Sequence, residues 1–221
     1  MSETNTASED GVLLEQLQEW AKLYGFQELG VSDIDLSKAE QSLAKWLQAK
    51  FHGEMDYMER HGKKRSRPDE LVAGTVRVIT ARMDYWPEAG SDAWEVIADD
   101  QKGFISRYAL GRDYHKLMRK RLSKLAEKIQ SELAGTAFRV FCDSAPVLEK
   151  ALAEKSGLGW LGKHSNILNR EHGSYFFLGE IYTDLPLPLT QAVSDHCGSC
   201  TACIDICPTQ AIVEPYVVDA R

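Results

Sequence analysis

The chain has 221 residues, of which 43% are apolar and 27% charged, and its formal net charge is −7. These proportions are typical of a globular protein and exclude a collagen, a disulfide-dense miniprotein and a disordered chain, while the length predicts one large domain with at most a small appendage. The N-terminus lacks the basic and apolar regions of a signal peptide, and no run of about 18 apolar residues exists. We therefore expect a cytoplasmic protein that does not span a membrane.

The N-terminal third of the chain predicts a leader and two helices. Residues 1–11 are polar and acidic and predict a disordered leader. Apolar side chains at helical spacing predict a helix over 12–24 and a second over 37–53. Ser37 and Glu40 have the spacing of a capping box, which predicts that Ser37 caps the second helix.

The remaining elements mix strands and helices. A run of β-branched residues predicts a buried strand at 75–82, and a loop follows at 83–103. The longest periodic segment, 112–134, predicts a helix with one apolar stripe and a basic opposite face. The stripe consists of Tyr114, Met118, Leu122, Leu125, Ile129 and Leu133. After it we expect a strand at 137–142, a helix at 147–156, a strand at 174–182 and a linker at 184–195. The mixture indicates an α/β or α+β fold, and the strand order stays open.

Four of the five cysteines lie close together near the C-terminus. Cys197, Cys200, Cys203 and Cys207, followed by Pro208, have the spacing C-x2-C-x2-C-x3-C-P of bacterial ferredoxins. Short gaps let a tight loop wrap one corner of an iron–sulfur cubane. The alternative, a structural zinc site, usually takes two C-x2-C pairs separated by a longer loop. The spacing therefore favours a 4Fe-4S cluster.

The ferredoxin spacing assigns three thiolates to one cubane and the fourth to a second. Only residues 208–221 follow Cys207, and none of them is cysteine. We therefore expect a fragment that lacks a second cysteine run. A single cubane held by all four cysteines is the alternative. The isolated Cys142 predicts a buried and inert thiol.

Three segments together resemble one family, the epoxyqueuosine reductases. They are ISRYALGRDYHKLMRKRLSKLAEKI, VFCDSAPVLEKALAEKSGLGWLGKHSNILNREHGSYFFLGEIYTDLPLP and DHCGSCTACIDICPTQAIVEPYVVDAR. The resemblance runs from about residue 12 to the end. It implies a cobalamin-binding domain at 12–184, similar to the core of reductive dehalogenases, and the first half of a ferredoxin-type domain at 185–221.

The resemblance also implies a reaction and its partners. The family reduces epoxyqueuosine to queuosine and water at the wobble position of tRNA, a two-electron and two-proton step that uses cobalamin and, in the intact protein, two 4Fe-4S clusters. An external donor such as a flavodoxin or ferredoxin system would supply the electrons to a monomeric enzyme. Two other functions stay open: a reductive dehalogenase, and a ferredoxin-type electron carrier with an N-terminal docking domain.

Asp143 matches the family's proton donor, in the segment Cys142-Asp143-Ser144 after a predicted strand. To donate at neutral pH a carboxyl must keep its proton, and burial against an apolar corrin favours the protonated form. The alternative is an ordinary N-cap of the helix at 147–156.

The resemblance places further residues near the corrinoid. Lys150 matches a basic position, although a solvated helix face would also explain it. Ile167 and Leu178 match main-chain contacts, although core packing explains them as well. Ser106 aligns near the cobalt, and Arg65 lies in the KKRSRPDE motif. The complete set that the resemblance assigns to cofactor binding is Arg65, Ser106, Asp143, Lys150, Lys163, His164, Ser165, Ile167 and Leu178.

Two remaining features concern His115 and the basic residues. Some corrinoid proteins ligate cobalt through D-x-H-x-x-G, but here no glycine follows His115, so we interpret it as structural. Basic residues concentrate at 60–67 and on the 112–128 helix face. An acidic protein that handles tRNA needs such a local patch, and we favour 60–67, although a solvated surface explains either run equally well.

Overall fold

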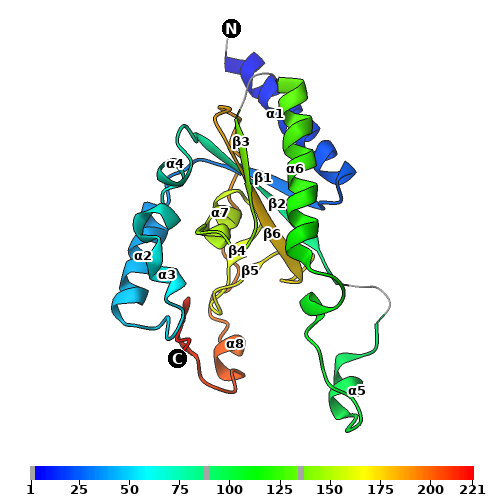
Figure 1. Cartoon of the computed structure of the whole chain (residues 1–221), viewed down its shortest axis with the longest axis vertical. Coiled ribbons are helices and arrows are strands. Elements are labelled where there is room, and N and C mark those ends of the chain that lie inside the picture. Colours follow the sequence, from blue (N-terminus) through cyan, green and yellow to red (C-terminus); the bar gives the residue numbers. More distant parts are fainter. Residues whose placement is uncertain (1–2, 87–89, 134–136) are drawn as a thin grey trace.

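The centre of the protein is a four-stranded antiparallel sheet. The computed structural model describes residues 3–86, 90–133 and 137–221. The sheet has the order β1-β2-β6-β3, and every neighbouring pair is antiparallel (Figure 1). Its strands are β1 (Glu28–Ser32), β2 (Arg77–Asp84), β3 (Phe138–Phe141) and β6 (Phe176–Thr183). Of the two predicted fold classes this sheet is α+β, and β1 is a strand that the sequence analysis did not predict.

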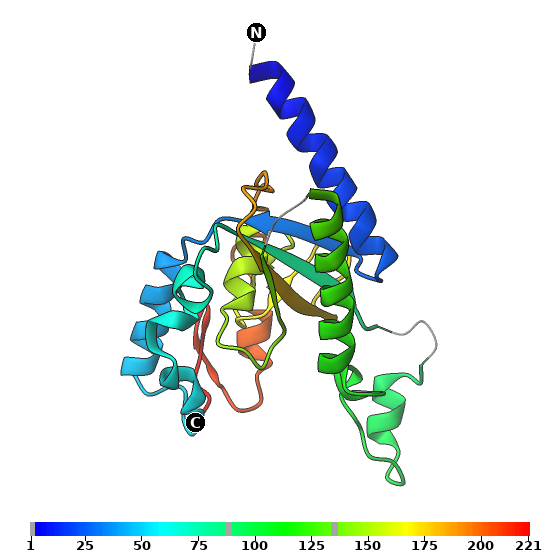
Figure 2. The ribbon, with the colours of Figure 1, turned by 45° about the horizontal axis from the view of Figure 1, so that its top comes forward.

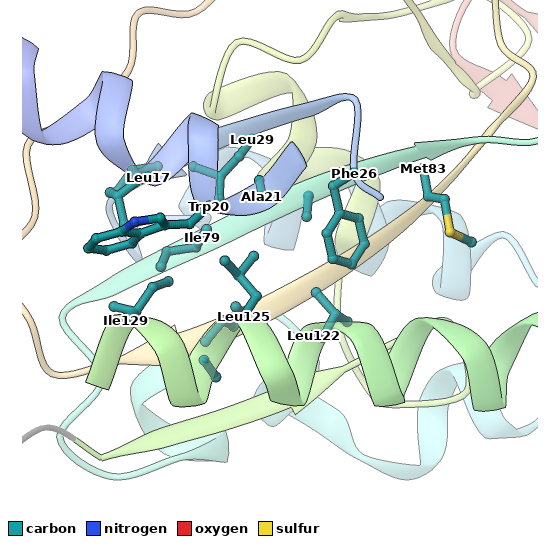
Figure 3. Close-up of a cluster of buried hydrophobic side chains, with 14 of the residues drawn as sticks. Leu17, Trp20, Ala21, Phe26, Leu29, Ile79, Met83, Leu122, Leu125 and Ile129 are labelled. Atoms are coloured by element: carbon teal, nitrogen blue, oxygen red, sulfur yellow. The ribbon is translucent and has the colours of Figure 1, made fainter. Parts of the chain in front are cut away.

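Two helices cover one face of the sheet. They are α1 (Glu3–Leu23) and α6 (Tyr114–Leu133), which cross the strands on the same side (Figure 2). The predicted apolar stripe of α6 is buried and packs with α1 against β1 and β2 in the main hydrophobic core (Figure 3). Leu17, Leu122 and Ile129 are fully buried in this cluster, so periodicity correctly identified its core residues.

The short helix α7 (Glu149–Lys155) covers the other face. It lies so close that a Cβ on Gly30 of β1 would stand 2.1 Å from the Ser156 carbonyl oxygen. Since no side chain fits there, a glycine at position 30 is required for this packing.

The N-terminal predictions need two corrections. α1 begins at Glu3, where the sequence analysis expected a disordered leader; residues 1–2 lie outside the described residues. The helix continues upstream because no proline interrupts it. In α2 (Ser37–Gln48) the N-cap is Leu36, and it makes no side-chain cap hydrogen bond. The predicted capping box is therefore wrong: Glu40 instead accepts hydrogen bonds from Ser66 and Arg67.

The segment between α2 and β2 forms short helical turns: α3 (Tyr57–Arg60), η1 (Gly62–Arg65) and α4 (Pro68–Leu71). Arg65 is buried and donates to the Tyr57 carbonyl oxygen at 2.8 Å. Arg67 forms ion pairs with Glu40 at 2.9 Å and with Glu70 at 2.8 Å. Two of the basic side chains in the predicted RNA-binding run therefore hold this segment together.

The predicted loop at 83–103 contains the end of β2 and one helix, α5 (Ala93–Ala98), whose N-cap Asp92 accepts from two backbone amides. Residues 87–89 of this loop lie outside the described part of the chain, as does residue 134 at the end of the predicted 112–134 helix. The turn η2 (Arg107–Ala109) follows α5. Beyond α7, β4 (Trp160–Leu161) and β5 (Ile167–Leu168) form a small hairpin.

The C-terminal segment is tied to the rest of the protein at several points. It contains α8 (Ala202–Asp205), β7 (Ile212–Glu214) and β8 (Val217–Val218). Trp46 Nε1 donates to the Val218 carbonyl oxygen at 2.7 Å, and the Ala220 amide donates to the Phe51 carbonyl oxygen at 2.8 Å. In the described part of the chain, no helix combines the length and apolar character needed to cross a membrane.

Candidate active site

A cavity opens at one end of the sheet, where β3 ends, β6 begins and helices α6 and α7 both start. Aromatic and apolar side chains share its wall with carboxyl, amide, hydroxyl and ammonium groups. The lining residues are Tyr85, Tyr114, Asp143, Glu149, Lys150, Asn166, Ile167, Ser174, Phe176, Phe177 and Leu178. An apolar wall with a few convergent polar groups is typical of a cofactor site.

Asp143 lies at the mouth of this cavity. Its backbone has φ +45°, a left-handed conformation that aspartate tolerates better than most residues. The carboxyl oxygen Oδ2 accepts a hydrogen bond from the Tyr114 hydroxyl and lies 3.1 Å from His115 Nε2. The N-cap of α7 is Leu148. The alternative interpretation of Asp143 as that cap is therefore wrong, and its carboxyl faces the cavity instead.

His115 bridges two carboxylates. Its Nδ1 lies 2.9 Å from Asp113 Oδ1, and the same oxygen accepts the His115 backbone amide. This hydrogen bond holds the pKa of Asp113 below its usual value, so Asp113 stays ionised and keeps a proton on Nδ1. Nε2 is the ring nitrogen that faces Asp143. The sequence interpretation of His115 as merely structural therefore misses its contact with the candidate proton donor.

Aromatic stacking fixes the two side chains that contact the Asp143 carboxyl. The Tyr114 ring lies on Phe177 at a centroid distance of 3.9 Å and on the His115 ring at 4.0 Å. The sequence analysis assigned Tyr114 to the buried stripe of its helix, since a phenol at helical spacing resembles a core residue. Its partial burial, its hydrogen bond to Asp143 and the charge of that carboxyl raise the pKa of the phenol, so Tyr114 remains a hydrogen-bond donor.

Lys150 supports the opposite wall of the cavity. Its Nζ donates to the Ser165 carbonyl oxygen and to Asn166 Oδ1, each at 2.9 Å. Ser165 has φ +62°, so this lysine stabilises a tight turn in the segment that lines the cavity. Glu149, its neighbour in the chain, also lines the cavity. The sequence analysis missed Glu149 because an acidic residue at a helix start is commonplace.

The structure brings together some of the predicted cofactor residues and separates others. Asp143, Lys150, Ile167 and Leu178 line the cavity, whereas Ser165 and His164 lie in the adjoining turn outside the lining. Lys163 instead donates from Nζ to the carbonyl oxygens of Gly198 and Cys200, at 2.7 and 2.8 Å. Arg65 and Ser106 are not part of the lining either: Arg65 is buried in η1, and Ser106 precedes η2 on the surface.

The cysteine run begins in a loop with Cys197 and Cys200, continues through the short helix α8 with Cys203, and ends at Cys207. Asp195 accepts the Cys197 amide at 2.7 Å, and the loop turns at Gly198 with φ +44°. A hydrogen bond with Thr209 and the backbone amides of Ile212 and Ala211 hold the pKa of Cys207 below its usual value. They favour the thiolate, which is the form that ligates iron.

The residues present fit the two cofactors that the resemblance implies. Among the described residues, no three or more His, Cys, Asp or Glu side chains are grouped to hold a single metal ion. A cubane has a different requirement, because each thiolate binds its own iron, and the cysteines of the short segment 197–207 provide such ligands. The cavity offers apolar side chains to the face of a macrocycle, such as Ile167 and Leu178, and polar groups to an amide rim, such as Lys150 and Asn166.

Comparison with known proteins matches two segments of the chain to known families. The family model "Epoxyqueuosine reductase QueG, DUF1730" matches residues 65–144, and the model "4Fe-4S double cluster binding domain" matches residues 196–221. The epoxyqueuosine reductase of Pseudomonas aeruginosa is 58% identical over 210 residues, which cover 95% of this chain and 58% of the relative. That of Escherichia coli is 56% identical over 209 residues, covering 95% and 55%. The chain resembles the epoxyqueuosine reductases along nearly its whole length.

Solved structures support the same likeness to epoxyqueuosine reductases. One, determined with an epoxyqueuosine-modified stem loop of tRNA-Tyr, has a TM-score of 0.81 at 26% identity and covers 95% of this chain and 55% of that one. Another, from Bacillus subtilis, has its catalytic aspartate loop swung out of the active site; its TM-score is 0.82 at 28% identity, with the same coverage. A catabolic reductive dehalogenase shares the fold, with a TM-score of 0.51 at 12% identity, covering 92% of this chain and 23% of that one.

This chain spans a little over half the length of the curated epoxyqueuosine reductases that it matches. The likeness covers the cavity and the cysteine run together, and the fold resembles that of reductive dehalogenases as the sequence analysis expected.

Proposed function

We propose that this chain is part of an enzyme that reduces epoxyqueuosine to queuosine in tRNA, with cobalamin in the cavity and 4Fe-4S clusters on the cysteine run. The proposal rests on the similarity to proteins named epoxyqueuosine reductase. One of these was solved with an epoxyqueuosine-modified tRNA stem loop. The observation that carries the proposal is the Asp143 carboxyl, which Tyr114 and His115 hold in the lining of a cavity that combines apolar and polar side chains.

The proposed organisation has two parts. Residues 12–184 form the cobalamin-binding and catalytic part, and residues 185–221 form the first half of a ferredoxin-type part. Lys163 belongs to the first part and binds the loop of the second, which keeps the cysteine run beside the cavity segment. We place the enzyme in the cytoplasm as a monomer, where an external flavodoxin or ferredoxin system supplies electrons.

Cobalamin, when bound, would supply the two-electron chemistry, and side chains of the protein would hold and transfer the protons. Removal of an epoxide oxygen as water breaks two C–O bonds, forms one C=C bond and consumes two electrons and two protons. Asp143 is positioned to give the first proton from its carboxyl. The Tyr114 hydroxyl then stabilises the carboxylate that is left, because a hydrogen bond to an ion is stronger than one to a neutral group.

Replacement of Asp143 by Asn tests this role. Asparagine adopts φ +45° about as well as aspartate and is nearly isosteric, but it cannot donate a carboxyl proton. In the protein of the relatives' full length we expect normal cobalamin binding and a loss of turnover of 10²–10⁴, the usual cost of removing a general acid. Asp69→Asn, at an exposed residue of α4, is the control and should retain activity. Wild-type turnover by the Asp143→Asn enzyme with cobalamin bound would reject the role.

Two substrate assays and one spectrum separate the alternatives. A corrinoid that binds the 221-residue chain, seen in its visible spectrum, excludes a simple electron carrier. Turnover of organohalides but not of epoxyqueuosine tRNA would favour the reductive dehalogenase, whose fold this chain shares.

A further inference from the structure

Lys163, which the resemblance assigns to the corrinoid, contacts the cysteine run instead. Its Nζ donates to the carbonyl oxygens of Gly198 and Cys200, at 2.7 and 2.8 Å. Both belong to the loop at 195–201, the cysteine loop. This loop and α8 after it contain aspartates but no lysine or arginine. In the described part of the chain, no other lysine or arginine hydrogen-bonds to the cysteine loop. The Lys163 ammonium is therefore the positive charge that contacts it.

A closed ring of contacts joins the main chain and the side chain of Lys163 to the cysteine loop. The Lys163 carbonyl oxygen accepts a hydrogen bond from the Tyr216 amide at 2.9 Å. The Tyr216 hydroxyl donates to Asp195 at 2.8 Å, and Asp195 accepts the Cys197 amide at 2.7 Å. The chain then continues from Cys197 to Gly198, whose carbonyl oxygen accepts from the Lys163 ammonium. Because the ring closes on Lys163, this residue fixes the position of the first cysteine of the run.

The turn that carries Lys163 also contributes to the cavity wall. Within this turn, the Ser165 amide donates to the Gly162 carbonyl oxygen, and the Gly162 amide donates to the Asn166 carbonyl oxygen, each at 2.8 Å. Asn166 lines the cavity together with Lys150, which donates to Ser165 and Asn166. One short turn, built by its own hydrogen bonds, therefore contacts the cysteine loop and lines the cavity.

A lysine at this position acts on a bound cubane through its charge. The reduction potential of a cubane depends on its net charge and its surroundings, and reduction adds one negative charge to it. The Lys163 ammonium contacts the main chain of Cys200, one of the predicted ligands. A positive charge there stabilises the reduced cubane more than the oxidised one, because the attraction grows with the negative charge. Lys163 should therefore raise the reduction potential.

We propose that Lys163 is a positioning residue for the cubane that Cys197, Cys200 and Cys203 ligate. It holds the cysteine loop against the turn of the cavity wall, and its charge raises the reduction potential of that cubane. The cubane then accepts one electron from the external low-potential donor more readily, while Lys163 itself is neither oxidised nor reduced. This inference rests on the iron–sulfur part of the proposed function and is independent of the tRNA substrate. It gives Lys163 a role at the cluster in place of the corrinoid contact that the resemblance implies.

A redox titration measures this effect without substrate. The protein of the relatives' full length is reconstituted with iron and sulfide, reduced stepwise with titanium(III) citrate and mediators, and followed by electron paramagnetic resonance. Lys163→Met keeps the length of the side chain and removes its charge, so we expect it to lower the potential of one cubane and to leave the other unchanged. At a fixed solution potential, the ratio of reduced to oxidised cluster should fall about tenfold, which corresponds to about 59 mV for a one-electron couple.

Further variants separate the charge of Lys163 from its hydrogen bonds. Lys163→Arg keeps the charge and should retain the wild-type potentials. Lys163→Gln can still donate to a carbonyl oxygen but is neutral, so its potential should fall as in Lys163→Met. Lys22→Met, at an exposed lysine of α1 that pairs with Glu19, is the matched control and should leave both potentials unchanged. Iron analysis should give about eight irons in every variant, the content of two cubanes.

The outcomes of this titration can be told apart. If Lys163→Met and Lys163→Gln hold both cubanes at the wild-type potentials, the role of Lys163 is rejected and the proposed function stands. If a neutral variant loses one cubane, retention of that cubane at the wild-type potential in Lys163→Arg supports the role, whereas its loss from Lys163→Arg as well rejects the effect of charge. If the wild type itself takes up no cubane, the iron–sulfur part of the proposed function is rejected together with this inference.

Discussion

Tyr114 combines packing with chemistry in a single side chain. Its ring lies nearly parallel to Phe177, at an interplanar angle of 11°, while its hydroxyl donates to Asp143. The stack holds the phenol in one orientation, so the hydrogen bond costs little side-chain entropy when it forms. The sequence does not reveal this double role, because it depends on the contact of the ring with Phe177 and of the hydroxyl with Asp143.

A matched pair of substitutions separates the two contributions of Tyr114. Tyr114→Phe removes the hydroxyl and keeps the stack, and we expect turnover to fall roughly tenfold, the usual effect of one hydrogen bond to a charged group. Tyr114→Leu also removes the stack and frees His115, so its turnover should fall further. Steady-state kinetics at saturating tRNA, with cobalamin occupancy measured spectroscopically, decide between them. Equal effects of the two substitutions would show that the hydroxyl alone matters.

At the scale of elements, helix α6 connects the core, the cavity and the surface. Its buried stripe includes Met118, Leu122 and Leu125, and its first turn carries Tyr114 and His115 to Asp143. The opposite face exposes basic side chains, namely Lys116, Arg119, Lys120 and Lys124. Because this face begins at the cavity mouth, a tRNA whose wobble base enters the cavity would lie close to it.

The two basic runs can be compared by the salt dependence of tRNA binding. We expect Lys120→Ala with Lys124→Ala to reduce the slope of log K against log salt by about 0.7–0.9 for each lost phosphate contact. Lys63→Ala with Lys64→Ala removes the same charge from the 60–67 run. This comparison leaves Arg65 and Arg67 intact because both have structural partners. A reduced slope in the Lys63 and Lys64 variant alone would return the RNA site to the 60–67 run that the sequence analysis favoured.

At the scale of the whole molecule, the cysteine segment is attached to two separate regions. Lys163 binds the cysteine loop beside the cavity, and Trp46 and Phe51 bind the end of the chain near α2. The Tyr216 amide also donates to the Lys163 carbonyl oxygen at 2.9 Å. These contacts hold the candidate cluster loop and the cavity wall in one structure, which electron transfer between two cofactors requires.

Iron analysis tests how the four cysteines are shared. We expect Cys197, Cys200 and Cys203 to ligate one cubane and Cys207 to ligate another, so the 221-residue chain should hold at most about four labile irons. A protein of the relatives' full length should hold about eight, the content of two cubanes. Iron and sulfide are measured on both proteins after anaerobic reconstitution. Four stable irons in the shorter chain, lost in Cys207→Ser, would assign all four cysteines to a single cubane.

Sequence patterns alone predicted several structural features of this protein. Helical periodicity identified the buried stripe of α6, since Leu122 and Ile129 recur on one face whatever packs against them. The cysteine spacing predicted an iron–sulfur loop, because ligand spacing is set by the cluster and the tight turn alone. The resemblance predicted site roles for Asp143, Ile167 and Leu178, and the structure places all three in the lining of one cavity.

Tertiary structure alone decided which side chains meet. Ser37 and Glu40 have the spacing of a capping box, but Arg67, far along the chain, offers Glu40 a stronger charged partner. Lys163 lies in the segment beside the cavity, yet its long side chain reaches the carbonyl oxygens of the cysteine loop. His115 is distant in sequence from Asp143, and only the packing of α6 against the sheet brings its imidazole to that carboxyl. Side-chain contacts depend on this packing because neither periodicity nor spacing encodes the direction of one element relative to another.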